Sequence, residues 1–303
     1  MFIEQAYKGI NTWWRVALTT LCTAGIFIGN FVAYFMMSKE EMDEVYKSMS
    51  EIPNNLSLVF NLSPFVFLLG LLFLFVRNLH NRSILSLTTA RNKIDYKRIF
   101  FSFSLIVLLT VSLFIVTYFM DNSNIVWNFN PLKFGVLFLI SVLLFPCQIG
   151  LEEYLFRGYL MQQIGIIVKN RWFPLVFTSV IFGLFHGANP EVAKMGYGVM
   201  IFYIGTGLLL GIMTLMDESL ELALGFHLGN NMMAALLITS DYSAIHTDAV
   251  FKYSGVENPA DILNEMIISI AIVYPIILYI FAKRYNWTNW KAKLTGKVLP
   301  QIK

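Results

Sequence analysis

The feature that most constrains this chain is a series of long apolar runs separated by short polar connections. A helix of about 20 apolar residues spans the roughly 30 Å hydrocarbon layer of a bilayer. Because backbone amides must be paired within lipid, we expect these runs to be helices, and the shorter alternating segments of a barrel are absent. The sequence therefore predicts an all-α membrane protein, a bundle of about eight transmembrane helices, at residues 16–37, 56–76, 99–120, 132–156, 172–188, 198–216, 220–239 and 262–282.

Composition limits what else the chain can contain. Hydrophobic residues make up 57% of it and charged residues 14%, whereas soluble domains carry about 25% charge. We expect one integral membrane domain, made of a three-span segment (1–131), a core (132–240) and a last span with a basic tail (241–303). The net charge of +3 is small, so we expect membrane lipids around the chain and no nucleic-acid partner.

Charges in the connections predict orientation, because basic loops tend to stay in the cytoplasm. With eight spans, this rule places both termini inside, most simply in the cell membrane. Basic residues crowd the second connection and the tail, at Arg77, Arg82, Arg91, Lys93, Lys97, Arg98, Lys283, Arg284, Lys291, Lys293, Lys297 and Lys303. Acidic residues crowd the first connection and the segment after the seventh run, at Glu40, Glu41, Asp43, Glu44, Glu51, Asp241, Asp248, Glu257 and Asp261.

Polar and ionisable side chains also occur inside the apolar runs, where a charge costs roughly 2.5–3.5 kcal/mol even on insertion scales. Each such residue therefore calls for a partner or a function. On a helix, Glu153 and Arg157 share a face and can form an ion pair, while Glu152 points about 100° away. The residues concerned are Glu152, Glu153 and Arg157 in one run, Phe182 and His186 in the next, and His227 and Asn231 in a third.

Chain geometry predicts that these groups converge. If the fourth and fifth runs form a hairpin that turns at residues 169–171, Glu152 and His186 lie 17 residues on either side of Lys169 and at one depth. His227 and Asn231 lie one helical turn apart on one face. A buried glutamate can take a proton from water, His186 can help to orient that water, and His227 with Asn231 can stabilise an oxyanion.

Purely structural interpretations compete with this one. A Glu153–Arg157 pair inside a bundle is often only an ion pair that holds helices together, and a single membrane histidine or asparagine can simply bond to a neighbouring helix. Phe182 alone indicates packing. The combination of all these residues in one half of the chain favours a site, since each burial is costly.

Two further features have ordinary structural interpretations. The glycines at 205, 207 and 211 are typical of close helix packing. His80 and His246 fall in polar connections, so we expect both to be solvated.

The three motifs together resemble those of the CAAX protease and bacteriocin-processing family of intramembrane glutamic endopeptidases, related to the Ras-converting CAAX prenyl endopeptidases. The family pattern EExxxR, FxxxH and HxxxN appears in order at 152–157, 182–186 and 227–231, and the similarity covers about residues 145–240. The resemblance implies eight helices, a glutamate-type mechanism without an obligatory metal, and a catalytic set of Glu152, His186, His227 and Asn231, supported by Glu153 and Arg157.

The resemblance also bears on the substrate. Eukaryotic members trim the last three residues from prenylated proteins, whereas bacterial members are linked to peptide maturation and self-immunity. We therefore expect a peptide or protein substrate, and both a lipid-modified and a membrane-bound one remain open.

Two alternatives stay open. A zinc metalloprotease could use Glu152, His186 and His227 as ligands, but the sequence has no HExxH and Asn231 would bind zinc poorly, so we expect no cofactor. A scaffold or transporter could line a path with the same polar residues, although the paired repeats typical of transporters are not evident.

Overall fold

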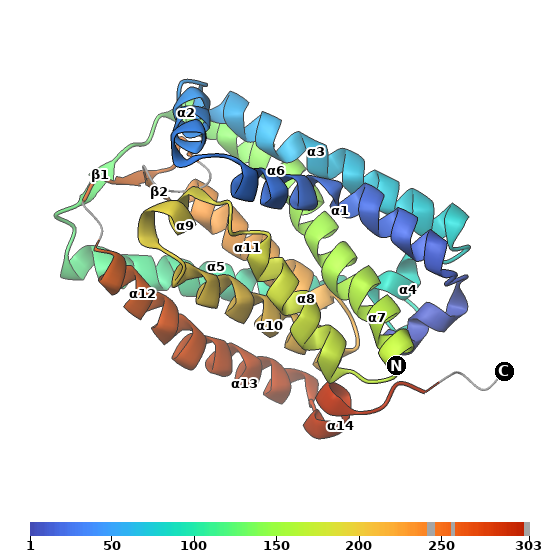
Figure 1. Cartoon of the computed structure of the whole chain (residues 1–303). Coiled ribbons are helices and arrows are strands. Elements are labelled where there is room, and N and C mark those ends of the chain that lie inside the picture. The colour runs from blue at the N-terminus through green and yellow to red at the C-terminus, as the bar shows by residue number, and fades with distance from the viewer. Residues whose placement is uncertain (241–245, 256–257, 300–303) are drawn as a thin grey trace.

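The structure, a computed structural model, describes residues 1–240, 246–255 and 258–299, and consists almost wholly of helices (Figure 1). Of the charged residues named above, Asp241, Glu257 and Lys303 lie outside the described residues, as do the side chains of Asp43 and Asp261. The prediction of an all-α membrane protein is confirmed.

Every predicted apolar run coincides with a helix. Within the described residues, six helices are long and apolar enough to cross a membrane. The α8 helix has only 13 residues and α11 has 16, so eight crossings remain a prediction. The corresponding helices are α1 (Trp13–Met36), α3 (Asn54–Leu74), α5 (Tyr96–Met120), α6 (Pro131–Glu153), α8 (Trp172–Leu184), α10 (Val199–Asp217), α11 (Glu221–Leu236) and the continuous set α12 (Pro259–Ile268), η4 (Ser269–Val273) and α13 (Tyr274–Tyr285).

The fourth helix is longer than predicted. It continues from α6 through the π-helical η3 (Tyr154–Leu160) and α7 (Met161–Val168), so its predicted end at residue 156 is wrong. Such π-helical turns often lie at functional sites. Lys169 ends α7 in a left-handed conformation, with φ 56°, and α8 begins at Trp172. The predicted hairpin turn at 169–171 is thus confirmed.

The connections contain short elements that the apolar pattern does not predict. The acidic first connection forms α2, and three strands of three residues form a small sheet in the order β1-β3-β2. The middle strand pairs antiparallel with β1 and parallel with β2. The elements are η1 (Ile3–Lys8), α2 (Lys39–Ser50), η2 (Phe75–Leu79), α4 (Ile84–Thr88), β1 (Ile125–Trp127), α9 (Pro190–Met195), β2 (Ile238–Ser240), β3 (Phe251–Tyr253) and α14 (Trp290–Thr295).

The α11 helix packs against α5, α6 and α10, while α8 packs along α10. Close approach of α8 and α10 depends on Gly207, because a Cβ there would lie 2.9 Å from the Ser179 carbonyl oxygen. The predicted close packing at these glycines is confirmed, since a Cβ at Gly211 would lie 2.5 Å from Leu175 Cδ1 and one at Gly205 3.0 Å from Ile270 Cδ1. These contacts place α6, α8, α10 and α11 around one region of the bundle.

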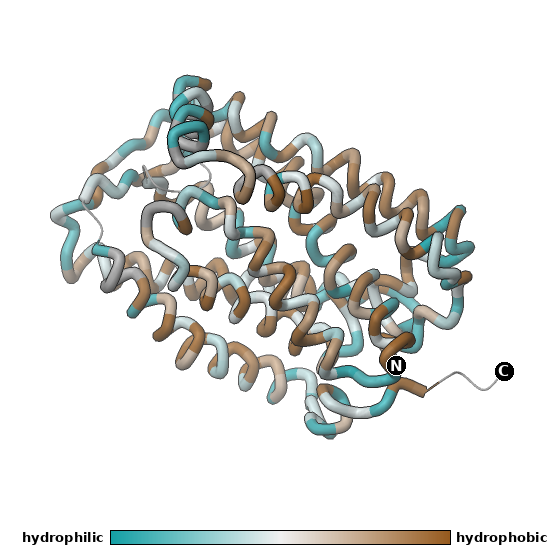
Figure 2. Tube along the Cα trace, viewed as in Figure 1, coloured by the Kyte–Doolittle hydropathy of each residue, from teal (hydrophilic) through white to brown (hydrophobic). Residues whose placement is uncertain are grey.

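The two ends of the bundle differ in character (Figure 1). One end, here named the strand end, carries α2, α9 and the three strands, whereas the opposite end, named the basic end, carries α4, α14 and the turns at 169–171 and 218–220. Between them, apolar residues follow the long helices (Figure 2). Many of these side chains are exposed, as a lipid-facing surface requires, including Leu21, Phe67, Phe100, Leu108, Leu139 and Leu143.

Candidate active site

The polar residues predicted from the sequence come from four elements. The end of α6 supplies Glu152 and Glu153, and η3 supplies Arg157. Phe182 lies in α8, and His186 lies in the turn that follows it. The α11 helix supplies His227 and Asn231. Side-chain contacts, which for Asn231 run through Gln148, join all of these residues into one connected region between the helices.

A fully buried ion pair anchors the region. Arg157 Nη1 donates to Glu153 Oε1 over 3.0 Å, one helical turn away, and both side chains are completely buried. Arg157 Nη2 donates to the Gly207 carbonyl oxygen over 3.2 Å, which ties η3 to α10. The predicted Glu153–Arg157 pair is therefore present, and it also holds two helices together.

Glu153 has a second partner that the sequence argument did not foresee. His227 Nδ1 donates to the same Oε1 atom over 2.8 Å, so Glu153 connects the end of α6 with α11. Because a carboxylate only accepts, this bond places a hydrogen on Nδ1 of the ring. The other ring nitrogen of His227, Nε2, faces Glu152, whose Oε2 lies 3.5 Å away. At that distance the two atoms are in ion-pair range but beyond a good hydrogen bond.

Glu152 is 3% exposed, and its two carboxylate oxygens have different surroundings. Oε1 accepts a hydrogen bond of 3.1 Å from Gln148 Nε2, one turn earlier on α6. Oε2 has no hydrogen-bond partner among the described residues. One carboxylate oxygen is thus fixed and the other is available to a small molecule.

Gln148 is a site residue that the sequence analysis missed. Its side-chain oxygen also accepts from Asn231 Nδ2 at 3.4 Å, so it connects Glu152 on α6 with Asn231 on α11. The available signal was its position four residues before Glu152, which places both on one helix face. Gln148 carries no charge, and therefore a search for ionisable groups passed over it.

His186 occupies a different part of the region. Its Nδ1 donates to the Phe182 carbonyl oxygen over 2.7 Å, leaving Nε2 as the acceptor nitrogen. Its ring stacks on Tyr203, with centroids 4.4 Å apart at an interplanar angle of 22°. Within the described part of the chain, no hydrogen bond or ion pair joins His186 to Glu152, so a shared role in holding water remains a prediction.

Phe182 links the two histidines. Its ring centroid lies 4.7 Å from that of His186 and 6.1 Å from that of His227. The Arg157 guanidinium lies over the same ring, 4.2 Å from its centroid, in cation–π geometry. Phe182 is therefore a packing residue, as its type suggests, and it positions three polar groups at once.

The expectation that His80 is solvated is wrong. It is 1% exposed, its Nδ1 donates to the Ile10 carbonyl oxygen over 2.7 Å, and Nε2 lies 2.8 Å from the Tyr159 hydroxyl and 3.0 Å from that of Thr19. Burial lowers the pKa of His80 below its ordinary value. A connection that looks polar in sequence folds back under η1, where a histidine can bridge segments. His246 is half-buried.

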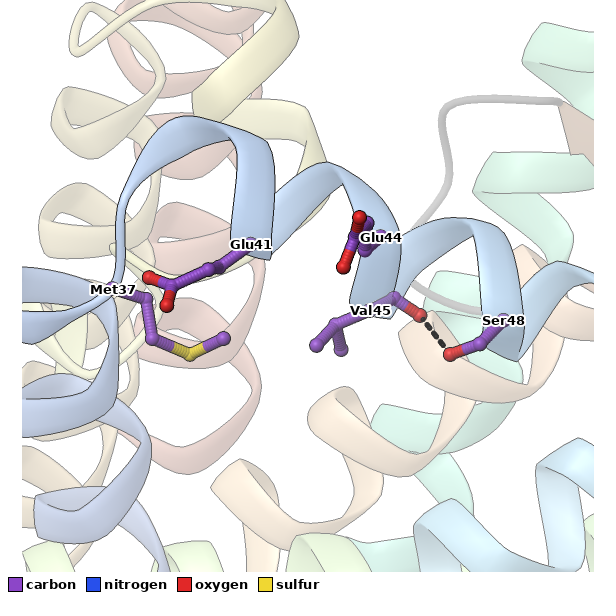
Figure 3. A pocket seen from close by; sticks show the side chains of 5 residues that line it. All are labelled: Met37, Glu41, Glu44, Val45 and Ser48. Carbon is purple, nitrogen blue, oxygen red and sulfur yellow. Dashed lines mark hydrogen bonds between the residues drawn. The ribbon is translucent and has the colours of Figure 1, made fainter.

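The surface grooves of the described residues lie away from the predicted site. A groove of about 450 Å³ runs along α2, lined by Met37, Glu41, Glu44, Val45 and Ser48 (Figure 3). None of the predicted site residues lines it. Among the described residues, no three His, Cys, Asp or Glu side chains are grouped as a metal site.

Two comparisons with known proteins match this chain. Residues 131–233 match the family model described as type II CAAX prenyl endopeptidase Rce1-like. The uncharacterized protein YyaK of Bacillus subtilis (strain 168) is 28% identical over 247 residues, covering 78% of this chain and 81% of that protein. No solved structure matches. The matched segment contains all seven predicted site residues, so the core of this membrane-spanning chain is similar to the type II CAAX prenyl endopeptidases in the same segment that carries its three motifs.

Proposed function

We propose that the chain is an intramembrane endopeptidase in which Glu152 activates a water molecule to hydrolyse a peptide bond, with no bound metal. The observation that carries this proposal is the hydrogen bonding of the two Glu152 carboxylate oxygens. Gln148 holds one oxygen, while the other has no hydrogen-bond partner among the described residues and lies 3.5 Å from His227 Nε2. An oriented carboxylate with one available oxygen is suited to general-base catalysis.

The proposed reaction begins when Glu152 Oε2 takes a proton from water. The oxygen of that water attacks the scissile carbonyl carbon, and His186 Nε2, as an acceptor, orients the second hydrogen of the water. Glu152 then delivers its proton to the departing amine, so that one water is consumed and a carboxylate and an amine are formed. A single carboxylate can thus act first as the general base and then, once protonated, as the general acid.

The oxyanion that forms during attack needs hydrogen-bond donors. His227 Nε2 and Asn231 Nδ2 are the candidates, since both lie on α11, the first beside Glu152 and the second beside Gln148, which holds Glu152. The ring must then carry hydrogens on both nitrogens, one directed to Glu153 and one to the oxyanion. The 2.8 Å bond from Nδ1 to Glu153 supports this role, because it fixes the ring and places a negative charge behind it.

The substrate we propose is a peptide or protein within or against the membrane. The family match supports a CAAX-type protease in general terms, and maturation of a peptide without a prenyl group is the other proposal. We also keep the division into segments 1–131, 132–240 and 241–303 as a proposal, with the chemistry confined to the second.

The test uses purified protein in detergent and a matched pair of peptides that differ only in a prenyl group on a cysteine near the carboxyl terminus. We expect mass spectrometry to detect new peptide termini from at least one of them. Absence of cleavage of both, and of a mixed library of apolar peptides, by a folded sample would contradict the protease assignment.

Gln148 provides a more specific prediction. Gln148→Ala should lower kcat by roughly 10- to 100-fold with little change in KM, because a hydrogen bond to a charged group contributes about 1.5–3 kcal/mol. Steady-state kinetics would measure this split. Gln163→Ala is the control, since Gln163 is a buried glutamine of the same continuous helix that donates to Asn11, outside the site. Equal losses in both variants would show that Gln148 acts only through folding.

A further inference from the structure

Burial within the site changes steadily along the bundle. Glu153 and Arg157 have no exposed surface, whereas Glu152 is 3% and His227 is 6% exposed. The remaining polar residues of the site, Gln148, His186 and Asn231, are half-buried. The site is thus closed on the side of the Glu153–Arg157 pair and most accessible on the side of these three residues.

The three half-buried residues are all displaced from the buried part of the site toward the same end of the bundle. Gln148 lies one turn before Glu152, toward the start of α6, and Asn231 lies one turn after His227, toward the end of α11. His186 follows the end of α8. The start of α6 follows β1 and the end of α11 precedes β2, which belong to one sheet. All three residues therefore lie on the strand-end side of the site.

Neighbouring residues follow the same trend. Every residue of α11 from Glu221 to His227 is buried, but from residue 228 to the end of the helix half-buried residues and the exposed Ala234 are mixed with buried ones. In α10, which runs the opposite way, half-buried residues predominate from 200 to 206, and residues 209–211 and 213–217 are buried. Access from the basic end is therefore blocked by packed side chains.

Charge distinguishes the two ends. The basic end carries most of the chain's lysine and arginine, including Arg77, Arg82, Arg91, Lys97, Arg98, Lys169, Arg171, Lys283, Arg284, Lys291, Lys293 and Lys297. The strand end instead carries Glu40, Glu41, Glu44, Glu51, Asp121 and Asp248. A bias of this kind orients membrane proteins with the basic end in the cytoplasm.

We infer that substrate reaches the site from the strand end, on the non-cytoplasmic face of the membrane. The inference rests on the proposed protease function and names its substrate class: a peptide segment presented at the outer surface, either an exported peptide or the outer juxtamembrane part of another membrane protein. A peptide confined to the cytoplasm meets the closed, basic end.

The experiment uses the full chain with Cys22 and Cys147 replaced by serine and one exposed marker cysteine, at Glu51→Cys on the strand end or Lys97→Cys on the basic end. A membrane-impermeant maleimide is applied to intact cells and, separately, to proteoliposomes. We expect position 51, and not position 97, to be labelled in cells. Labelling of position 97 alone would overturn the cytoplasmic placement of the basic end.

In the proteoliposomes, labelling gives the fraction of molecules whose strand end faces outward, and a membrane-impermeant peptide added outside gives the cleavage rate. We expect the rate to rise in proportion to that fraction across preparations of different orientation. A rate that follows the outward basic end, or that ignores orientation, would overturn the inferred access route. Cleavage in detergent is measured in parallel, so that loss of the protease function itself is recognised separately.

Discussion

Replacing Glu152 with glutamine is expected to lower kcat by roughly 10²- to 10⁴-fold, the usual contribution of a general base. The substitution keeps the shape of the side chain and its hydrogen bond with Gln148, but an amide cannot take a proton from water. His227→Ala should lower kcat as well, because it removes a proposed oxyanion donor. Turnover of a peptide in detergent, at matched amounts of folded protein, measures both effects.

A matched control separates chemistry from charge burial. Glu221 is also a buried glutamate and pairs with Arg91 at 2.8 Å, near the basic end and outside the proposed site. Glu221→Gln should retain near wild-type activity per folded molecule. If Glu152→Gln cleaves peptide at the wild-type rate, Glu152 is not the base, and the proposed reaction must be abandoned.

Arg157→Ala is expected to destabilise the protein by about 3–5 kcal/mol and to reduce activity. Breaking a buried ion pair leaves its partner as an uncompensated charge, and here the partner, Glu153, also fixes His227. The variant further loses the bond to the Gly207 carbonyl oxygen and the cation–π contact with Phe182. Thermal unfolding in detergent measures the first effect, and peptide cleavage measures the second.

Two comparison variants make this prediction specific. The double change Glu153→Gln with Arg157→Ala should recover part of the lost stability, since no unpaired charge remains, but not the activity. Arg171→Ala removes a different buried arginine, which bonds Glu4 at 2.7 Å, and should destabilise without lowering turnover per folded molecule. A melting profile for Arg157→Ala equal to that of the wild type would show that the pair does not stabilise the bundle.

Much of the fold could be predicted because hydrophobic length is a strong signal in membrane chains. The positions of the helices and the turn at 169–171 follow from apolar runs and one short polar break. The sheet and α2 could not be predicted in this way, since strands of three residues carry no periodicity and α2 has a polar, acidic composition. The continuation of α6 into α7 was missed because Arg157 and Gly158 follow directly after the apolar run predicted to end at residue 156.

The site was predictable to a similar degree. Spacing of four residues correctly indicates the Glu153–Arg157 pair, since it depends only on helix geometry. Contacts between helices depend on rotation and depth, which spacing does not contain, and so the bond from His227 to Glu153 was not foreseen. The burial of His80 has the same cause, because its partners at Ile10, Thr19 and Tyr159 are far from it in the sequence and meet it only in the folded chain.

A zinc mechanism is the sharpest rival to the proposed one. His227 Nδ1 and His186 Nδ1 each donate to an oxygen, at 2.8 Å and 2.7 Å, and such bonds also orient histidines that ligate metal through Nε2. Zinc would need a third ligand, and Glu152 is the candidate; a ligand at that position could not also serve as the base. The two mechanisms thus assign Glu152 different roles.

The most direct measurement is therefore peptide cleavage by purified protein after exhaustive chelation, with elemental analysis of the same sample. The glutamate mechanism predicts that cleavage continues at the rate seen before chelation and that the sample contains far less than one zinc per chain. Stoichiometric zinc in the untreated protein, together with inactivation by chelator and recovery when zinc is added back, would contradict it and establish a metalloprotease instead.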